Sequence, residues 1–597
     1  MRFSGFSISQ IRQTLIFGIG RAVCRPNTIL NNMQPDTIFP SATDSCWNTH
    51  EVANQYPELS DYNLFTTDTV LNEWLLRTGA QWALPELARI GEDMGKPEMR
   101  ELGDTANRYT PVLKTFDSRG HRIDTVEFHP AWHRFMAYTK QAGLISRPFE
   151  DEKSGRWAFS AADFILQAQT EAGSLCPATM TLAAIPVLKK EPALWQRIEA
   201  KILSREYDGR DVPIEQKTSI WIGMGMTEKQ GGSDVRSNTT TATPVGKPGR
   251  GEGYLLRGHK WFFSAPMCDA HLVVARTSDS DALGCFFVPR WKPDGTKNPV
   301  RIQRLKDKVG NKSNSSSEVE FQDAWGLLIG EEGRGIPTII EMATYTRLCC
   351  VLGSAGVMRQ AAVQGIAYTR RRKAFGKPLY EQPLMRNVLA DFALESEAAT
   401  LTAMRLAEAF EKGDGDPLSK ALKRFITPAA KYWVCKRAVS LTGEAMEVFG
   451  GNGYVEEGIL GRLFREAPVN SIWEGSGNVM CLDVLRAMQK EKELVGLVLQ
   501  ELNRLAAGHA PLLEAVNGLT ALFTQNPQDL EGMARYLVER LTVTFQACLV
   551  HAYSPAYVGE AFIETRIVHP PSANFGAFNG SGLDLGALLE RAFPENG

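Results

Sequence analysis

The sequence lacks the features that mark several classes of protein. None of its ten cysteines forms a CxxC pair or a metal-ligand spacing, which argues against a zinc site or a disulfide framework and favours a reducing compartment. No stretch reaches the roughly 20 consecutive apolar residues that a membrane-spanning helix needs. The formal net charge is only -2, so no overall basic field attracts nucleic acid. We expect a cytoplasmic protein with no metal site.

What the sequence has is length and a balance of apolar and charged residues. Its 597 residues are 43% hydrophobic and 22% charged, which is typical of a globular protein with a large core. At about 150 residues per domain, this length predicts about four compact units.

The first 32 residues differ from the rest because they hold four arginines and no acidic residue. An Arg-rich, acid-poor start is typical of a targeting presequence. The alternative is an extension upstream of a true start at Met33, which we favour because ordinary globular sequence begins directly after that residue. We therefore expect 1–46 to be an extension outside the folded domains.

Four segments with different patterns follow this extension. They are a helical domain (47–218), a β domain (219–330), a second helical domain (331–488) and a mostly helical C-terminal extension (489–597). Short β-rich runs separated by Gly, Pro, Asp and Asn predict a sandwich or barrel for the β domain. In the first helical domain a helix begins at Thr67-Asp68-Thr69, and in the second a helix begins near Pro428 and ends at Gly450-Gly451. The predicted fold class is α+β.

Two motifs in the β domain suit a flat, phosphate-bearing ligand. The stretch 226–234 holds two adjacent glycines, which let the backbone turn sharply and present N–H groups to an anion. A later strand carries three successive aromatic residues, followed by Ser264. Because side chains alternate along a strand, Trp261 and Phe263 would lie on one face, and Phe262 and Ser264 on the other. Taken alone, the first motif also fits an ordinary loop and the second an aromatic core strand.

Two further motifs lie in the second helical domain. The stretch 370–378 has four consecutive cations, an aromatic residue and a Gly-x-Pro turn, which suit phosphate binding or simply the charged C-terminal end of a helix. The second motif places Glu474 between Trp473 and a Gly-Ser-Gly turn. A carboxylate in an apolar pocket has a raised pKa and can act as a base, but the same acid could begin a helix with Ser476 as its cap.

In their order and spacing, these motifs resemble the acyl-CoA dehydrogenase superfamily. The matching segments are 227–234 (Thr-Glu to Gly-Ser-Asp), 260–264, 372–376 (Arg-x-x-Phe-Gly), 450–454 (Gly-Gly-x-Gly-Tyr) and 473–476 (aromatic-Glu-Gly-Ser). The resemblance covers 47–488. It implies FAD as cofactor, a homotetramer, and a β middle domain between helical N- and C-terminal domains.

The strings WIGMGMTEKQGGSDV, GHKWFFS, FITPAAK and SIWEGSGN are similar to the AidB branch of this family, which acts in the bacterial response to DNA alkylation. This likeness supports Met33 as the true start. It also implies an alternative function, a DNA-binding flavoprotein in which FAD is structural and the C-terminal region contacts double-stranded DNA.

The resemblance assigns the catalytic base to Glu474. In some relatives the base lies on an earlier helix, just before an arginine, but here Thr346 holds that position before Arg347 and cannot serve. Phe262 would flank the flavin ring, and Ser264 would hydrogen-bond flavin N5. The implied reaction is α,β-dehydrogenation of an acyl-CoA thioester, in which the base removes the α proton and the β carbon gives hydride to N5.

Other residues are assigned to FAD by the same resemblance. Arg372 and Phe375 would reach the FAD of a neighbouring subunit. Asn478 would contact the cofactor that lies beside the base. Glu447 departs from the pattern, because many relatives have a glutamine near the partner's pyrophosphate, and a carboxylate there would need a cationic neighbour. The remaining residues expected at the cofactor are Met224, Met226, Thr227, Gly232, Ser233, Phe263, Ile472, Trp473, Gly475 and Ser476.

The alternatives to dehydrogenation differ in what they demand of the chain. Residues 491–597 hold twelve Asp or Glu and only six Lys or Arg, a net charge of −6, which gives DNA binding little support unless 370–373 and Arg437 form a local basic patch. Such binding would weaken steeply with salt. An acyl-CoA oxidase is a third possibility, distinguished by rapid reoxidation of the reduced flavin by O₂.

Overall fold

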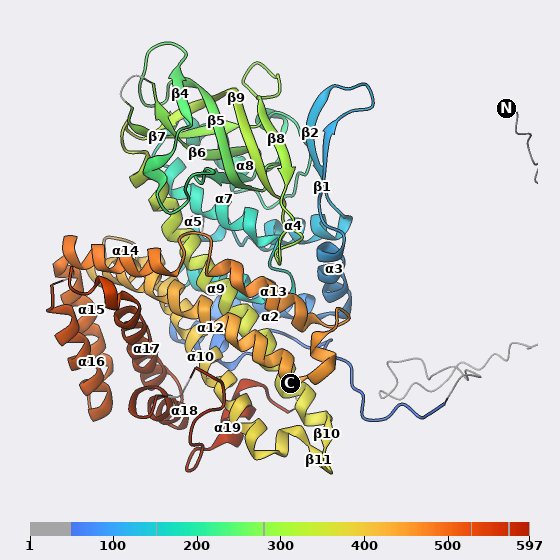
Figure 1. Cartoon of the computed structure of the whole chain (residues 1–597), viewed down its shortest axis with the longest axis vertical. Coiled ribbons are helices and arrows are strands. Elements are labelled where there is room, and N and C mark those ends of the chain that lie inside the picture. The colour runs from blue at the N-terminus through green and yellow to red at the C-terminus, as the bar shows by residue number, and fades with distance from the viewer. Residues whose placement is uncertain (1–48, 151, 279–280, 527, 571–572, 596–597) are drawn as a thin grey trace, which may run out of the picture. The chain divides into compact units, whose positions relative to one another are not determined.

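The computed structural model describes residues 49–150, 152–278, 281–526, 528–570 and 573–595, so the unusual segment 1–32 lies outside the described residues. The chain divides into two units, 1–53 and 54–597, and the second carries all the elements below. None of the described helices is long and apolar enough to cross a membrane. In Figure 1 the strands β4 to β9 lie together, apart from the C-terminal helices, and α7 lies between the two groups.

Helices dominate the N-terminal part, as predicted. They are α1 (Thr69–Arg77), α2 (Leu84–Gly95), α3 (Pro97–Arg108), α4 (Pro130–Ala142), α5 (Arg147–Glu150), α6 (Arg156–Thr170), α7 (Leu175–Leu188) and α8 (Pro192–Ile202). α1 begins at the predicted cap, because the Asp68 carboxylate accepts a hydrogen bond from the Leu71 N–H at 3.1 Å. Its face of Val70, Trp74 and Leu75 is buried.

A β-hairpin, which the prediction of a helical domain over 47–218 did not include, interrupts these helices. Its strands are β1 (Val112–Phe116) and β2 (Arg122–Glu127), which pair antiparallel. The turn between them is fixed by Asp117, whose Oδ1 accepts hydrogen bonds from the N–H groups of Arg119 and His121 at 2.8 and 2.9 Å. That Asp-initiated turn is the feature of the sequence from which this hairpin could have been predicted.

The middle of the chain forms the predicted β domain. Its strands are β3 (Ile222–Gly225), β4 (Thr241–Pro244), β5 (Gly253–Ser264), β6 (Ala270–Thr277), β7 (Leu283–Pro289), β8 (Val300–Leu305) and β9 (Ser316–Ile329). Pairing runs β4–β5–β9–β7–β6 and back to β4, so five strands close into a barrel, with β3 added to β6 and β8 to β9. Closure leaves these five strands without a free edge. The interior packs Tyr254, Phe286 and Phe321.

The predicted alternation along β5 does not hold, because the strand is irregular. Its register against β9 shifts between Lys260 and Phe263, so these two side chains, three positions apart, are both buried and both approach Gly225. Trp261 therefore does not share a face with Phe263. A bulge of this kind re-aims the side chains around it, and here it leaves Phe262 half exposed.

Helices return after the barrel, which confirms the predicted fold class. They are α9 (Gly335–Arg371), α10 (Pro383–Lys412), α11 (Pro417–Ala421), α12 (Thr427–Val448), α13 (Ile459–Asn470) and α14 (Gly477–Lys490), with a short hairpin of β10 (Lys373–Ala374) and β11 (Lys377–Pro378). α9 is buried along most of its length. A π-helical turn, Leu422–Ile426, precedes Pro428, which lacks the N–H of a regular helix.

The C-terminal region is helical and packs on α10 and α12. It comprises α15 (Lys492–Leu505), α16 (Ala510–Phe523), α17 (Ala534–Tyr553), α18 (Ala556–Ile563) and α19 (Leu585–Ala592). α15 buries Leu494, Val498 and Leu502 along one face. Arg591 on α19 joins this region to the N-terminal part, because it pairs with Glu73 at 2.7 Å as well as with α10.

Candidate active site

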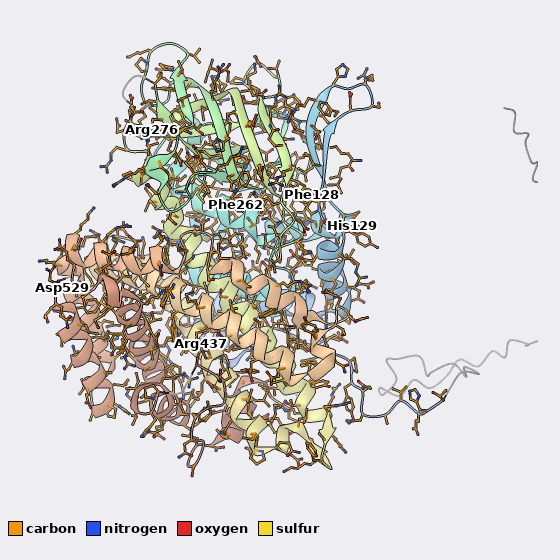
Figure 2. All side chains as sticks on the ribbon, in the orientation of Figure 1. Phe128, His129, Phe262, Arg276, Arg437 and Asp529 are labelled. Atoms are coloured by element: carbon orange, nitrogen blue, oxygen red, sulfur yellow. The ribbon has the colours of Figure 1, made fainter. Side chains whose placement is uncertain are left out.

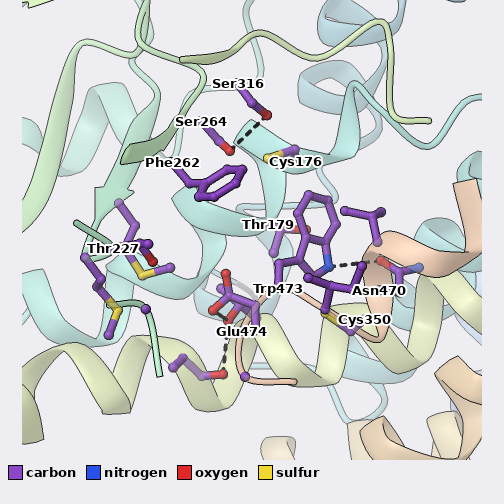
Figure 3. A pocket seen from close by; sticks show the side chains of 18 of the residues that line it. Cys176, Thr179, Thr227, Phe262, Ser264, Ser316, Cys350, Asn470, Trp473 and Glu474 are labelled. Atoms are coloured by element: carbon purple, nitrogen blue, oxygen red, sulfur yellow. Dashed lines mark hydrogen bonds between the residues drawn. The ribbon is translucent and has the colours of Figure 1, made fainter. Parts of the chain in front are cut away.

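One cavity of about 640 Å³ collects segments from all three parts of the fold. Its walls come from the loop after β3, the end of β5, the helices α6, α7 and α9, and the turn between α13 and α14 (Figure 3). Most of the residues predicted at the site line this cavity. They are Met224, Met226, Thr227, Gly232, Ser233, Phe262, Ser264, Ile472, Trp473, Glu474, Gly475 and Ser476.

Four predicted residues lie elsewhere in this chain. Phe263 turns into the barrel core and stacks on the His271 ring, with centroids 4.0 Å apart. Arg372 donates a hydrogen bond to the Asn54 carbonyl. Phe375 is 99% exposed. Asn478 accepts a hydrogen bond from Arg535 at 2.8 Å. Glu447, the departure from the family pattern, is exposed, and no described cation lies within 4.0 Å of it.

Glu474 stands in the cavity wall at the end of an unusual turn. Its backbone has φ +59°, a conformation that few non-glycine residues adopt. Its Oε2 accepts a hydrogen bond from the Thr346 hydroxyl at 2.6 Å, which is the dashed contact below Glu474 in Figure 3. Burial raises the pKa of Glu474, while that hydrogen bond and the charges of Lys431 and Arg347 act in the opposite direction.

Two buried cations hold the backbone of this turn. Lys431 on α12 donates to the carbonyl groups of Trp473, at 2.5 Å, and Gly475. Arg347 on α9 donates to the carbonyl of Glu474 at 3.1 Å. Lys431 was not among the residues predicted at the site. Its only sequence signal was a lysine placed among the apolar residues of a helix.

The indole of Trp473 is fixed beside the base. Its Nε1–H donates to Asn470 Oδ1 at 3.1 Å, and Asn470 Nδ2 in turn donates to the Ser354 hydroxyl at 3.2 Å. Figure 3 shows the indole between Asn470 and the carboxylate of Glu474. This chain of hydrogen bonds places an apolar ring against the base and supports its desolvation.

A second buried pair braces the loop 226–234. Glu228 and Lys260, each 1% exposed, lie 2.7 Å apart. The carboxylate also accepts hydrogen bonds from the N–H groups of Thr239 and Thr240 at 2.8 and 3.2 Å. Burial alone would raise the pKa of Glu228, but the charge and hydrogen bond of Lys260 lower it to about 2. The loop is thus tied to β5 by an ionised pair.

The β wall presents an aromatic face and a hydroxyl group. Phe262 is 52% exposed, and it lies where the strands approach the helices (Figure 2). The Ser264 hydroxyl lies 3.4 Å from Ser316 Oγ and is also a hydrogen-bond partner of the Cys176 side chain. Lys306 lies over the Phe262 ring, 4.6 Å from its centroid.

Neither metal nor thiolate chemistry fits the described residues of this cavity. No group of three or more His, Cys, Asp or Glu residues in the described part of the chain could hold a metal ion. Cys176, Cys349 and Cys350 line the cavity, but burial raises the pKa of Cys176 and of Cys349 to about 12. These thiols stay protonated and are poor nucleophiles. The carboxylates of the cavity wall, Glu228, Glu466 and Glu474, remain as its candidate proton acceptors.

Sequence comparisons identify the family that carries this site. Family models match three consecutive segments: the N-terminal domain of the adaptive response protein AidB over 54–209, the acyl-CoA dehydrogenase middle domain over 223–324, and the acyl-CoA dehydrogenase C-terminal domain over 333–489. AidB of Escherichia coli (strain K12) is 50% identical over 458 residues, which are 76% of this chain and 83% of that protein. This chain belongs to the acyl-CoA dehydrogenase family.

Other members of the acyl-CoA dehydrogenase family match over most of the chain. Acyl-CoA dehydrogenase family member 11 of Caenorhabditis elegans is 31% identical over 456 residues, 73% of this chain and 72% of that protein. The crystal structure of C. elegans ACDH-11 in complex with C11-CoA superimposes with a TM-score of 0.77 at 25% identity, covering 86% of this chain and 93% of that one. The structure of the Bd2924 apo-form superimposes with a TM-score of 0.76 at 28% identity, covering 84% of this chain and 100% of that one. The predicted likeness to the AidB branch and the predicted fold are confirmed.

Proposed function

We propose that this protein is an FAD-dependent acyl-CoA dehydrogenase that oxidises the α,β carbon–carbon bond of an acyl-CoA thioester, with Glu474 as the base. One observation carries the proposal: a carboxylate with a raised pKa stands in the same cavity as Phe262 and Ser264. Such a base suits the removal of a proton from a weakly acidic carbon. Membership of the family supports this class of reaction.

The residues of the β wall fit a flavin. The half-exposed ring of Phe262 offers a flat apolar face, and the Ser264 hydroxyl in the cavity wall can donate to a ring nitrogen. Gly232 lets the loop fold tightly on itself, since a Cβ there would lie 3.1 Å from the Thr227 side chain. When bound, FAD supplies the acceptor for the hydride of the β carbon.

The helical wall fits an acyl chain. The residues that give it apolar character are Phe164, Ala168, Ala172, Leu175, Met180 and Gly353. Apolar surface of this kind stabilises a buried alkyl chain by roughly 25 cal/mol per Å². The C. elegans ACDH-11 structure holds C11-CoA, and we carry an acyl-CoA ligand over to this chain on the strength of the family relationship and this wall.

The chain's own residues position the base and exclude water from it. Thr346 donates to one carboxylate oxygen of Glu474 and leaves the other to meet the α proton. Trp473 covers the carboxylate on one side. A thioester α proton is only weakly acidic, so the exclusion of water and the raised pKa both favour its transfer to the carboxylate.

A homotetramer is part of the same proposal. Phe375 lies on the β10–β11 hairpin, 99% exposed and at φ +51°. An aromatic side chain held in this way favours burial against another molecule. We propose that it reaches, with Arg372, the FAD of a neighbouring subunit.

DNA binding is the alternative, and two of its candidate cations, Arg370 and Arg437, are engaged within the chain. Arg370 pairs with Glu590 at 3.1 Å. Arg437, among the C-terminal helices in Figure 2, pairs with Glu395 at 3.3 Å and lies over the Phe575 ring. Cations engaged within the chain contribute less to phosphate contacts. Salt-sensitive binding of duplex DNA by the purified protein would reinstate the alternative.

The test of the proposal is Glu474→Gln. We expect the variant to retain its flavin absorption and to lose anaerobic bleaching by acyl-CoAs by about 100- to 10,000-fold, the usual contribution of a general base. The matched control is Glu466→Gln, because Glu466 is another buried acid in the cavity wall that already accepts hydrogen bonds from Asn311. Full bleaching by Glu474→Gln would exclude the assignment. Rapid reoxidation of the bleached wild type by O₂ would indicate an oxidase.

A further inference from the structure

Lys431 is a charged group beside the base that the proposed reaction does not consume. It lies on α12 and is 1% exposed. No described carboxylate lies within 4.0 Å of its Nζ, in contrast to Arg347, which pairs with Asp483 at 2.7 Å. The partners of Lys431 are two carbonyl groups, those of Trp473 at 2.5 Å and Gly475. A buried ammonium without a counter-ion is costly, so this arrangement needs a reason.

The turn that Lys431 binds is itself strained. Glu474 has φ +59° and Gly475 has φ +100°, and a non-glycine residue in this region costs on the order of 1–3 kcal/mol. The reversal directs the carbonyl groups on either side of the base toward the interior, where each needs a donor. With Arg347 on the carbonyl of Glu474, three successive carbonyl groups are bound by two cations.

We infer that Lys431 is a positioning residue for proton abstraction: by binding the carbonyl groups on both sides of Glu474, its ammonium group keeps the carboxylate directed into the cavity and places a positive charge beside it. The inference rests on the proposed function. It has a geometric part, the hydrogen bonds to the turn, and an electrostatic part, the charge that no neighbouring carboxylate neutralises. Different substitutions separate the two.

The surroundings of Glu474 make the electrostatic part measurable. The charged or titratable groups that act on the base, or on which it acts, are Lys431 on α12, Arg347, Cys349 and Cys350 on α9, and Cys176 on α7. The thiols remain protonated because burial raises their pKa. Arg347 is already paired with Asp483. Lys431 is therefore the uncompensated charge that bears on the carboxylate.

The experiment compares Lys431→Met, Lys431→Gln and the control Lys436→Met in the FAD-loaded protein. Methionine keeps the length of the side chain but loses both donors and charge, whereas glutamine keeps a donor without charge. Lys436 lies on the same helix, with its ammonium group 5.7 Å from the centroid of the Tyr432 ring and its side chain beside Gly477, but it makes no hydrogen bond to the carbonyl groups of the turn. The readouts are the pH profile of anaerobic bleaching by an acyl-CoA, the affinity for that acyl-CoA, and hydrogen exchange of the amides of 471–477.

For Lys431→Met we expect the bleaching rate to fall by about 10- to 100-fold, as displacement of a catalytic group causes, with little change in acyl-CoA affinity. The acidic limb of the pH profile should move to higher pH, because loss of a nearby cation raises the pKa of a carboxylic acid, and exchange in 471–477 should accelerate. Lys431→Gln should show the same displacement of the acidic limb with slower exchange than Lys431→Met. Lys436→Met should match the wild type in all three readouts.

Two outcomes would overturn the inference. One is a wild-type pH profile in Lys431→Met and Lys431→Gln, and the other is unchanged amide exchange in Lys431→Met. If Lys431→Met does not fold, the pH profile of Lys431→Gln decides. If no acyl-CoA bleaches the wild type, the proposed function is refuted. Hydrogen exchange requires no turnover, so it would still test whether Lys431 holds the turn.

Discussion

Two buried lysines brace two walls of the cavity, and their charges are compensated differently. Lys260 on β5 forms an ion pair with Glu228 at 2.7 Å, and backbone N–H groups occupy other acceptor positions of that carboxylate. Lys431 on α12 binds carbonyl groups and has no carboxylate partner among the described residues. The first brace is electrically neutral, and the second leaves a positive charge next to Glu474.

The difference separates a structural brace from one that also acts on the chemistry. A buried ion pair contributes little net stability compared with an apolar replacement, but removal of one partner is expensive because the other charge remains buried. A buried cation bound by carbonyl dipoles keeps its field, which the low local dielectric strengthens. We therefore expect substitutions at Lys260 to affect folding, and those around Glu474 to affect the base.

The largest expected effect follows Lys260→Met. The variant leaves Glu228 ionised and unpaired in the interior, and we expect the free energy of unfolding to fall by about 3–5 kcal/mol. The loop 226–234 should then lose its attachment to β5 and retain less flavin. Urea unfolding and the flavin content of the purified protein measure the two effects.

The double variant Lys260→Met/Glu228→Gln is the control that isolates the unpaired charge. It removes both charges and should recover most of the lost stability. Lys229→Met, at the exposed neighbouring lysine, should stay within about 0.5 kcal/mol of the wild type. Equal destabilisation in the single and double variants would show that packing, rather than charge, accounts for the loss.

A smaller effect is expected from Thr346→Val, which removes the hydroxyl that donates to Glu474. One hydrogen bond to a charged group contributes about 1.5–3 kcal/mol, so the rate of flavin bleaching below neutral pH should fall by about tenfold. The acidic limb of its profile should move to higher pH, because that hydrogen bond lowers the pKa of the base.

Thr442→Val is the matched control for this substitution. Thr442 is also fully buried, and its hydroxyl donates to carbonyl groups of its own helix. It should leave the pH profile unchanged. Coincident profiles for wild type and Thr346→Val would mean that the 2.6 Å contact does not influence the base.

The features that the sequence predicted correctly are those that depend on neighbouring residues. The cap at Asp68 and the start of α12 near Pro428 depend on one or two side chains and the backbone beside them. The segments around Phe262 and Glu474 could be located because their residue types occur in a recognisable order. That these segments meet in one cavity could then be expected from the fold of the family.

The features that it did not predict depend on contacts between distant segments. Lys431 lies more than 40 residues before the turn it holds, and its apolar neighbours in the sequence indicate burial but not which segment it binds. The register shift in β5 arises from pairing with β9, so strict alternation placed Trp261 and Phe263 together when the chain separates them. Phe375 and Arg372 were assigned to a neighbouring subunit, and that assignment stays a prediction.

The smallest expected effect is the pH dependence of stability at Glu228 and Glu474, the carboxylates on which these two lysines act. Glu228 has a folded pKa of about 2, below its ordinary value of 4.5, so the stability that it contributes is present above about pH 4.5 and is lost as pH falls toward 2. Burial raises the folded pKa of Glu474 above 4.5, so its contribution is present below pH 4.5 and is lost as pH rises through the folded value. Thermal unfolding of Glu228→Gln and Glu474→Gln at about pH 4 and pH 7 measures both. Relative to wild type, the melting temperature of Glu228→Gln should fall more at pH 7 than at pH 4. The melting temperature of Glu474→Gln should rise at pH 7. In a chain of this length, each kcal/mol of stability corresponds to about 1–2 °C. Shifts of the same sign in both variants would mean that the two sites are not compensated differently.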